Sequence, residues 1–78
     1  MIKVLLVEDE PPIQEMVSFT LSMRDIEVNC VSDVSSALVA LADSNSNFSC
    51  IIIDWMLPDK SGISLVKKIR SDASLKKL

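Results

Sequence analysis

The sequence lacks several residues on which common functional sites depend. It has no histidine, one glycine and two cysteines among its 78 residues. Because Cys30 and Cys50 do not form a Cys-x-x-Cys pair and no histidine is present, we expect no zinc site. The single glycine, Gly62, cannot form the Gly-x-Gly-x-x-Gly loop that binds dinucleotides, which argues against a flavin or dinucleotide binder.

Long apolar runs are also missing. No run approaches the roughly 20 residues that a membrane-spanning helix needs. The N-terminal "MIKVLLVEDE" meets acidic residues at once, whereas a signal peptide ends in small residues. We therefore expect a cytoplasmic protein with no membrane contact.

The net charge of -3 argues against direct binding of nucleic acid. With 49% hydrophobic and 24% charged residues, the chain is rich enough in core residues for one small folded domain.

Three apolar segments predict β-strands. Residues 2–7 ("IKVLLV") and 50–54 ("CIIID") are nearly continuous apolar runs, which are typical of strands buried on both faces of a sheet. Residues 26–31 ("IEVNCV") begin by alternating apolar and polar side chains, which is typical of an edge strand with one solvated face.

Three further segments predict helices, because their apolar residues recur three and four positions apart. The first is expected over about 12–23, after two prolines that suit a helix start. The second follows Ser32 or Asp33, either of which can cap it, and the third follows Gly62, which is expected to loosen the loop after Pro58. The residues expected to face inward are Ile13, Met16, Val17, Thr20 and Leu21 in the first helix, Val34, Ala37, Leu38, Leu41 and Ala42 in the second, and Leu65, Val66 and Ile69 in the third.

The alternation of strands and helices predicts an α/β fold with a parallel sheet. Right-handed crossovers and the edge character of residues 26–31 favour the spatial strand order 2-1-3, with the first and second helices on opposite faces. The chain then leaves the first and third strands in opposite directions, and ligands bind beyond the carboxyl ends of strands at such a switch point. Glu8, Asp9 and Asp54 follow those two ends. We therefore expect three carboxylates to lie together.

Three adjacent carboxylates need a cation or protons, since two of them about 4 Å apart repel by roughly 4 kcal/mol at an effective dielectric constant near 20. Carboxylate oxygens suit Mg²⁺. Magnesium can bridge to phosphoryl oxygens, and an aspartate can itself accept a phosphoryl group. The alternative is that "EDE" at 8–10 is a solvated acidic cap on the first helix and that Asp54 caps the end of its strand.

The segments "VLLVEDE", "IIIDWMLPDKSG" and "ISLVKKIRSD" resemble the receiver domain of bacterial two-component response regulators, the CheY-like family. The middle segment fits the family pattern D-x-x-[LM]-P-x-x-[SDG]-G. "VEDEPPIQEMV" and "DWMLP" look most like regulators of the phosphate-regulon type, whose receivers precede a winged-helix DNA-binding domain. The resemblance implies a flavodoxin-like three-layer α/β/α fold, and the family is a standard example of the strand order 2-1-3-4-5.

The resemblance also implies roles for particular residues. Asp54 would accept a phosphoryl group from a phosphohistidine on a sensor histidine kinase. Asp9 and Asp54 would bind Mg²⁺ directly, Glu8 would hold it through water, and the backbone carbonyl of Met56 would complete the protein ligands. The protein would then be a regulator rather than an enzyme, and it would act on DNA only through an output domain that these residues do not include.

The resemblance covers about the first three fifths of a receiver. Family members continue into a fourth strand that ends in Thr or Ser and a fifth that ends in Lys. Without them, the apolar strand at residues 50–54 would be an open edge, and one sheet face would keep only the first helix as cover. We therefore expect either a fragment of a longer protein or a homodimer, formed through this third strand or through the apolar sheet face. Cys30 and Cys50 lie on strands separated by the first strand and should not form a disulfide.

Two other functions compete with the phosphoacceptor receiver. The chain could be a receiver fragment that cannot be switched and acts only as a dimerising interaction module. It could also be a phosphatase with an aspartate nucleophile, but such enzymes have an Asp-x-Asp motif, and position 56 is Met.

Overall fold

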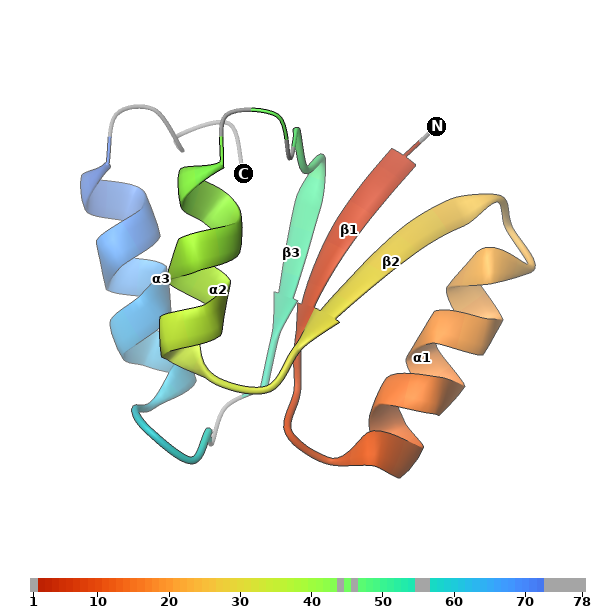
Figure 1. Ribbon diagram of the computed structural model, residues 1–78, viewed down its shortest axis with the longest axis horizontal. Helices are drawn as coiled ribbons and strands as arrows, with labels where there is room; N and C mark the ends of the chain where they lie inside the picture. The colour runs from red at the N-terminus through yellow and green to blue at the C-terminus, as the bar shows by residue number, and fades with distance from the viewer. Residues whose placement is uncertain (1, 44, 46, 55–56, 73–78) are drawn as a thin grey trace.

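The computed structural model describes residues 2–43, 45, 47–54 and 57–72, and it contains three strands and three helices in strict alternation. Figure 1 shows their arrangement. The elements are β1 (Ile2–Val7), α1 (Pro11–Ser22), β2 (Ile26–Val31), α2 (Val34–Ala42), β3 (Cys50–Ile53) and α3 (Gly62–Ser71). The predicted order of elements is confirmed.

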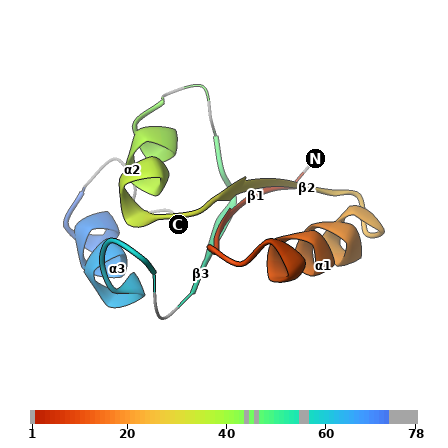
Figure 2. The ribbon, with the colours of Figure 1, turned by 60° about the horizontal axis from the view of Figure 1, so that its bottom comes forward.

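The sheet is parallel and has the spatial order β2-β1-β3. Val4 of β1 aligns with Val28 of β2 on one side and with Cys50 of β3 on the other. Both crossovers pass through helices, as the predicted α/β fold requires. Figures 1 and 2 place α1 on one face of the sheet and α2 with α3 on the opposite face.

The centre of the core lies between β1 and the helix pair α2 and α3. Leu5 and Val7 of β1 are fully buried there, together with Val34 of α2 and Leu65 of α3. The other two buried β1 side chains, Val4 and Leu6, point to the face that α1 covers. β1 is therefore the central strand, buried on both faces, as its continuous apolar run predicted.

The prediction for the first helix was partly wrong. No residue of α1 is buried, and Met16, expected to face inward, is 61% exposed. Thr20 is also exposed, and its hydroxyl donates to the carbonyl of Met16 at 2.8 Å. The cause is that α1 packs mainly against the edge strand β2, so that only a narrow stripe of residues meets the sheet. That stripe contains the half-buried Ile13, Val17 and Leu21.

Two other inward predictions also failed, one in α2 and one in α3. Ala42 is exposed at the last position of α2, and Val66 of α3 is 43% exposed because no further element covers that side of the helix in the described part of the chain. β3 ends at Ile53, and its side chains alternate between exposed and half-buried instead of being buried on both faces. This strand occupies an edge of the sheet, which accounts for its partial burial.

Both cysteines are free, as predicted, and the thiol of Cys30 lies 3.3 Å from the hydroxyl of Ser18 on α1. None of the helices in the described part of the chain has the length and apolar character that crossing a bilayer requires.

Candidate metal centre and phosphoacceptor site

The carboxyl ends of β1 and β3 bring three acidic side chains together. Glu8 follows β1, and its backbone N–H donates to the carbonyl of Val31 at 3.0 Å. Asp54 follows β3, and its N–H donates to the carbonyl of Val7 at 2.9 Å. These two bonds continue the ladders beyond the last strand residues and hold Glu8 and Asp54 at the same edge of the sheet. One oxygen from each of Glu8, Asp9 and Asp54 lies within 4.8 Å of the others.

The three acids differ in their surroundings. Glu8 is 7% exposed and is the one buried charged residue of the described core. Its Oε2 accepts a hydrogen bond from the backbone N–H of Glu10 at 3.1 Å. Asp54 is half-buried, and Asp9 is exposed. The cluster therefore has one closed side, formed by the sheet, and one side open to water.

A helix cap does not explain this arrangement. The N-cap residue of α1 is Glu10, and its side chain makes no capping hydrogen bond. The first turn of α1 contains no acidic residue, and two prolines occupy its start. Glu8 points into the protein, so the alternative that "EDE" is a solvated acidic cap is wrong for this residue.

The donor set of the cluster fits a hard divalent cation. Three carboxylates within 4.8 Å repel one another by at least about 3.5 kcal/mol per pair at an effective dielectric constant near 20. A divalent ion removes that repulsion, and Mg²⁺ in particular takes one or two protein carboxylates and keeps several waters. The open side at Asp9 leaves room for such waters. The fourth predicted ligand, the carbonyl of Met56, lies outside the described residues, as does Trp55.

Gly62 has a role that the sequence did not reveal. It was predicted to loosen the loop after Pro58, but it belongs to α3 rather than to that loop, and its φ is not positive. It is the buried first residue of α3, and a Cβ at this position would lie 2.2 Å from the carbonyl oxygen of Asp54 and 3.0 Å from Cγ2 of Ile53. A glycine is needed because the helix approaches the acceptor strand so closely.

Two polar side chains that join separate elements were also missed. Gln14 of α1 donates from Nε2 to the backbone carbonyl of Glu8, and the same nitrogen lies 3.5 Å from the hydroxyl of Ser32. Asp59, in the segment between β3 and α3, accepts hydrogen bonds from the first residues of α2. Asp59 has no local sequence signal, since its partners lie 24 and 25 positions away. The partners of Gln14 lie 6 and 18 positions away.

The loop carboxylate of Asp59 is strongly stabilised in its ionised form. The backbone N–H of Val34 is the main cause, and the N–H and hydroxyl of Ser35 add to it, so that the pKa of Asp59 falls to about 2. The predicted cap of α2 is confirmed as well, because the Asp33 side chain accepts from the N–H of Ser36 at 2.7 Å.

Comparison with known proteins agrees with this geometry. Residues 4–77 match the response regulator receiver domain family. The phosphate regulon transcriptional regulatory protein PhoB of Escherichia coli is 37% identical over 71 residues, which are 91% of this chain and 30% of that protein. The chain thus spans about three tenths of the length of the phosphate-regulon regulators that it matches.

Solved structures show the same fold. The response regulator TrrA of Thermotoga maritima in complex with Mg(2+)-BeF superimposes with a TM-score of 0.87 at 27% identity, covering 95% of this chain and 63% of that one. The complex of histidine kinase ThkA with TrrA gives a TM-score of 0.86 at 27% identity, covering 95% of this chain and 62% of the other. With the β2-β1-β3 order, the three acids and the match over residues 4–77, the chain belongs to the response regulator receiver domain family.

Proposed function

We propose that the chain is a phosphoacceptor module of a two-component phosphorelay and that Asp54 accepts the phosphoryl group. The observation that carries the proposal is the cluster of Glu8, Asp9 and Asp54 oxygens within 4.8 Å at the carboxyl ends of β1 and β3. In this proposal Asp9 and Asp54 bind Mg²⁺ directly, Glu8 holds it through water, and the Met56 carbonyl is the remaining protein ligand. The solved complex of TrrA with Mg(2+)-BeF supports a magnesium site in this fold.

The reaction requires little covalent chemistry from the protein. A carboxylate oxygen of Asp54 attacks the phosphorus of a phosphohistidine, and a P–O bond forms as the P–N bond breaks. The leaving imidazole keeps the electron pair of the broken bond and takes up a proton from solvent. Bound Mg²⁺ would neutralise the negative charges of the phosphoryl oxygens and of the carboxylates, which lie close together.

This chain's own residues orient the acceptor. The hydrogen bond from the Asp54 N–H to the carbonyl of Val7 holds the backbone of Asp54 against β1. Contact with Gly62 limits movement of the Asp54 carbonyl. The buried carboxylate of Glu8 keeps a second negative charge beside the cation. The chain is an acceptor and regulator in this proposal, not an enzyme that turns over a substrate.

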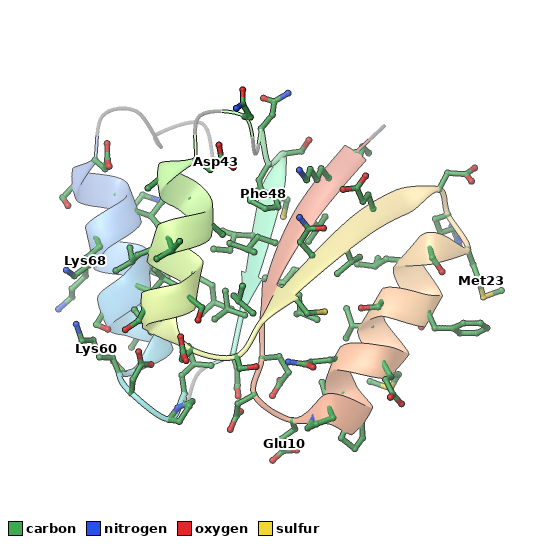
Figure 3. All side chains as sticks on the ribbon, viewed as in Figure 1. Glu10, Met23, Asp43, Phe48, Lys60 and Lys68 are labelled. Atoms are coloured by element: carbon green, nitrogen blue, oxygen red, sulfur yellow. The ribbon has the colours of Figure 1, made fainter. Side chains whose placement is uncertain are left out.

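A sensor histidine kinase is the proposed phosphoryl donor. The outward side of α1 carries Met16 and Phe19, and Met23 follows directly at the C-cap; these side chains are 61%, 67% and 69% exposed. Figure 3 shows Met23 pointing away from the sheet at the end of α1. α1 begins directly after the acidic cluster, so a partner protein bound along this apolar surface would reach toward Asp54 from the start of the helix. The solved complex of ThkA with TrrA supports a kinase as that partner.

The wider role rests on the relatives. The phosphate-regulon proteins are named transcriptional regulatory proteins, and we propose the same role here, through a DNA-binding output domain outside these residues. A cytoplasmic location, as expected from the sequence, agrees with this role.

A second candidate is a dimerising interaction module without phosphoryl transfer. β3 pairs only with β1 in the described part of the sheet. Ile52 is 40% exposed on the sheet face that α1 covers. An apolar groove of about 270 Å³ runs along the opposite face of the same edge and is lined by Ile51, Ile53, Val66, Ile69 and Arg70. Pairing of two β3 edges would cover both features.

Phosphoryl transfer separates the two candidates. The chain is incubated with acetyl phosphate and Mg²⁺, and the addition of one phosphoryl group is followed by intact-protein mass spectrometry. We expect addition in the wild type, none in Asp54→Asn and none when the metal is removed with EDTA. Asp25→Asn is the matched control, because Asp25 lies in the turn before β2 with φ 60°, a conformation that asparagine adopts readily. Modification of Asp54→Asn at the wild-type rate would exclude Asp54 as the acceptor. No modification, in a chain that sediments as a dimer, would favour the interaction module.

A further inference from the structure

Asp59 ties the segment after the acceptor to a different helix. Its Oδ1 accepts from the backbone N–H of Val34 at 2.9 Å, and its Oδ2 accepts from the N–H and the hydroxyl of Ser35, each at 3.0 Å. These are the first two residues of α2. The three bonds join parts of the chain 24 and 25 residues apart. In Figure 1 the start of α2 and the segment leading into α3 lie at the same end of the molecule.

The same segment is held at two further points. Leu57 packs against the core cluster. Gly62 lies so close to the Asp54 carbonyl that a single added carbon would be 2.2 Å from it. Residues 57–61 are therefore fixed to the core at one end, to the acceptor residue at the other and to α2 in between. The segment is held on both sides of Asp59, by Leu57 and by Gly62. A displacement at Asp59 therefore also displaces the residues that contact the acceptor.

α2 does not need Asp59 in order to begin. A helix leaves its first N–H groups without partners inside the helix, and a local cap normally serves one of them. Asp33 does this by accepting from the N–H of Ser36 at 2.7 Å. The N–H groups of Val34 and Ser35, next to the cap, donate instead to Asp59 from a distant part of the chain. Its carboxylate stays charged at neutral pH, since its pKa lies near 2. Bonds between a charged acceptor and helix N–H groups are stronger than bonds between neutral groups.

We propose that Asp59 is a positioning residue for the acceptor: by holding residues 57–61 against the first turn of α2, it keeps Asp54 in the geometry that binds Mg²⁺ and receives the phosphoryl group. The inference rests on the proposed function for its consequence, and it adds a residue that touches neither the acidic cluster nor the phosphoryl group. It also makes α2 respond to the site. On this proposal, a ligand that shifts Asp54 changes the strength of the bonds at Val34 and Ser35, and removal of those bonds changes the affinity for the ligand through the same coupling free energy.

The test compares two aspartates that cap the same helix. Asp59→Ala removes the three bonds to α2 and frees the loop. Asp33→Ala removes a cap of α2 whose hydrogen bond, from the N–H of Ser36, does not involve the loop. Both variants weaken the start of α2, so a merely structural role predicts similar behaviour. The proposal predicts that Asp59→Ala weakens Mg²⁺ binding by about tenfold, at the lower end of the range seen when a group that orients a metal ligand is removed. Asp33→Ala should change it by less than about twofold. Equal Mg²⁺ affinities in the two variants would overturn the inference.

A second readout needs no metal. Backbone amide resonances of Asp54 and Gly62, recorded by NMR without Mg²⁺, should shift in Asp59→Ala and stay in place in Asp33→Ala. The NMR comparison tests the role of Asp59 even if the wild type binds no Mg²⁺. Absence of Mg²⁺ binding would overturn the proposed function but not the positioning role. Unmoved resonances in Asp59→Ala would refute the positioning role. If Asp59→Ala does not fold, Asp59→Asn replaces it, because asparagine keeps the oxygen that faces Val34 and loses the one that faces Ser35. Its effects must then have the same sign and a smaller size.

Discussion

Gly62 is the position where one added methyl group should disturb the site most directly. The Cβ of an alanine would lie 2.2 Å from the carbonyl oxygen of Asp54, and such contacts are essentially never shorter than 3.0 Å. The first turn of α3 or the end of β3 must therefore move by about 0.8 Å. The alanine Cβ is attached directly to the backbone and the Asp54 oxygen belongs to it, so no side-chain rotation can relieve the clash.

Two effects of Gly62→Ala on stability oppose each other. Alanine in place of glycine stabilises a helix by about 1 kcal/mol where space is free. Overpacking of a close contact costs about 1–3 kcal/mol. We therefore expect a net loss of up to about 2 kcal/mol in the free energy of unfolding, measured by urea denaturation. Lys67→Ala, on the exposed side of the same helix, is the control and should change the free energy by less than about 0.5 kcal/mol.

The effect of Gly62→Ala on the site should exceed its effect on stability. A shift of about 1 Å in a group that must be aligned can cost roughly 100-fold in rate. We expect Mg²⁺ affinity and the rate of phosphorylation by acetyl phosphate both to fall by at least about tenfold on this basis. A variant that is more stable than the wild type and binds Mg²⁺ equally well would show that the close approach of α3 to Asp54 is not a constraint on the site.

Three further predictions concern the core, the loop carboxylate and the open edge. Leu5→Ala should lower the free energy of unfolding by about 2–5 kcal/mol, since Leu5 is fully buried, whereas Val39→Ala should change it by less than about 0.5 kcal/mol, since Val39 is 74% exposed; both are measured in urea. The pKa of Asp59 lies at about 2, below its usual 3.8, so its stabilising effect is present above about pH 4 and is lost as the pH falls toward 2. The difference in urea midpoint between the wild type and Asp59→Asn should shrink over that interval, and a constant difference would contradict this reasoning. If copies pair through the β3 edge or its sheet face, Ile52→Lys should shift sedimentation toward the monomer while Val39→Lys leaves it unchanged; equal behaviour of the two variants would exclude that interface.

The strand order and the convergence of the acids could be predicted because they follow from pattern and topology. Continuous apolar runs marked the central strand, and alternation marked residues 26–31 as an edge. Given a parallel sheet and right-handed crossovers, the residues after β1 and β3 had to meet. Glu8, Asp9 and Asp54 do so.

The failed predictions depend on distances in space rather than on spacing along the chain. Helical periodicity identified an apolar side of α1, but the number of residues it buries depends on whether the helix meets one strand or several. α1 packs mainly on β2, and Met16 stays exposed. The role of Gly62 depends on the separation between α3 and β3, which no local pattern encodes. The bonds from Asp59 to α2 likewise join distant segments, so a sequence motif could mark the residue but not its partner.

A magnesium titration tests the central claim most directly. Trp55 is the only tryptophan and follows Asp54 in the sequence, so its fluorescence should report metal binding at the cluster. We predict a saturable change in the wild type and in Asp25→Asn, and its loss in Asp9→Asn and in Asp54→Asn. A folded circular dichroism spectrum with no change in fluorescence or in heat on adding Mg²⁺ would contradict the account, because the three carboxylates would then be together without forming a metal site.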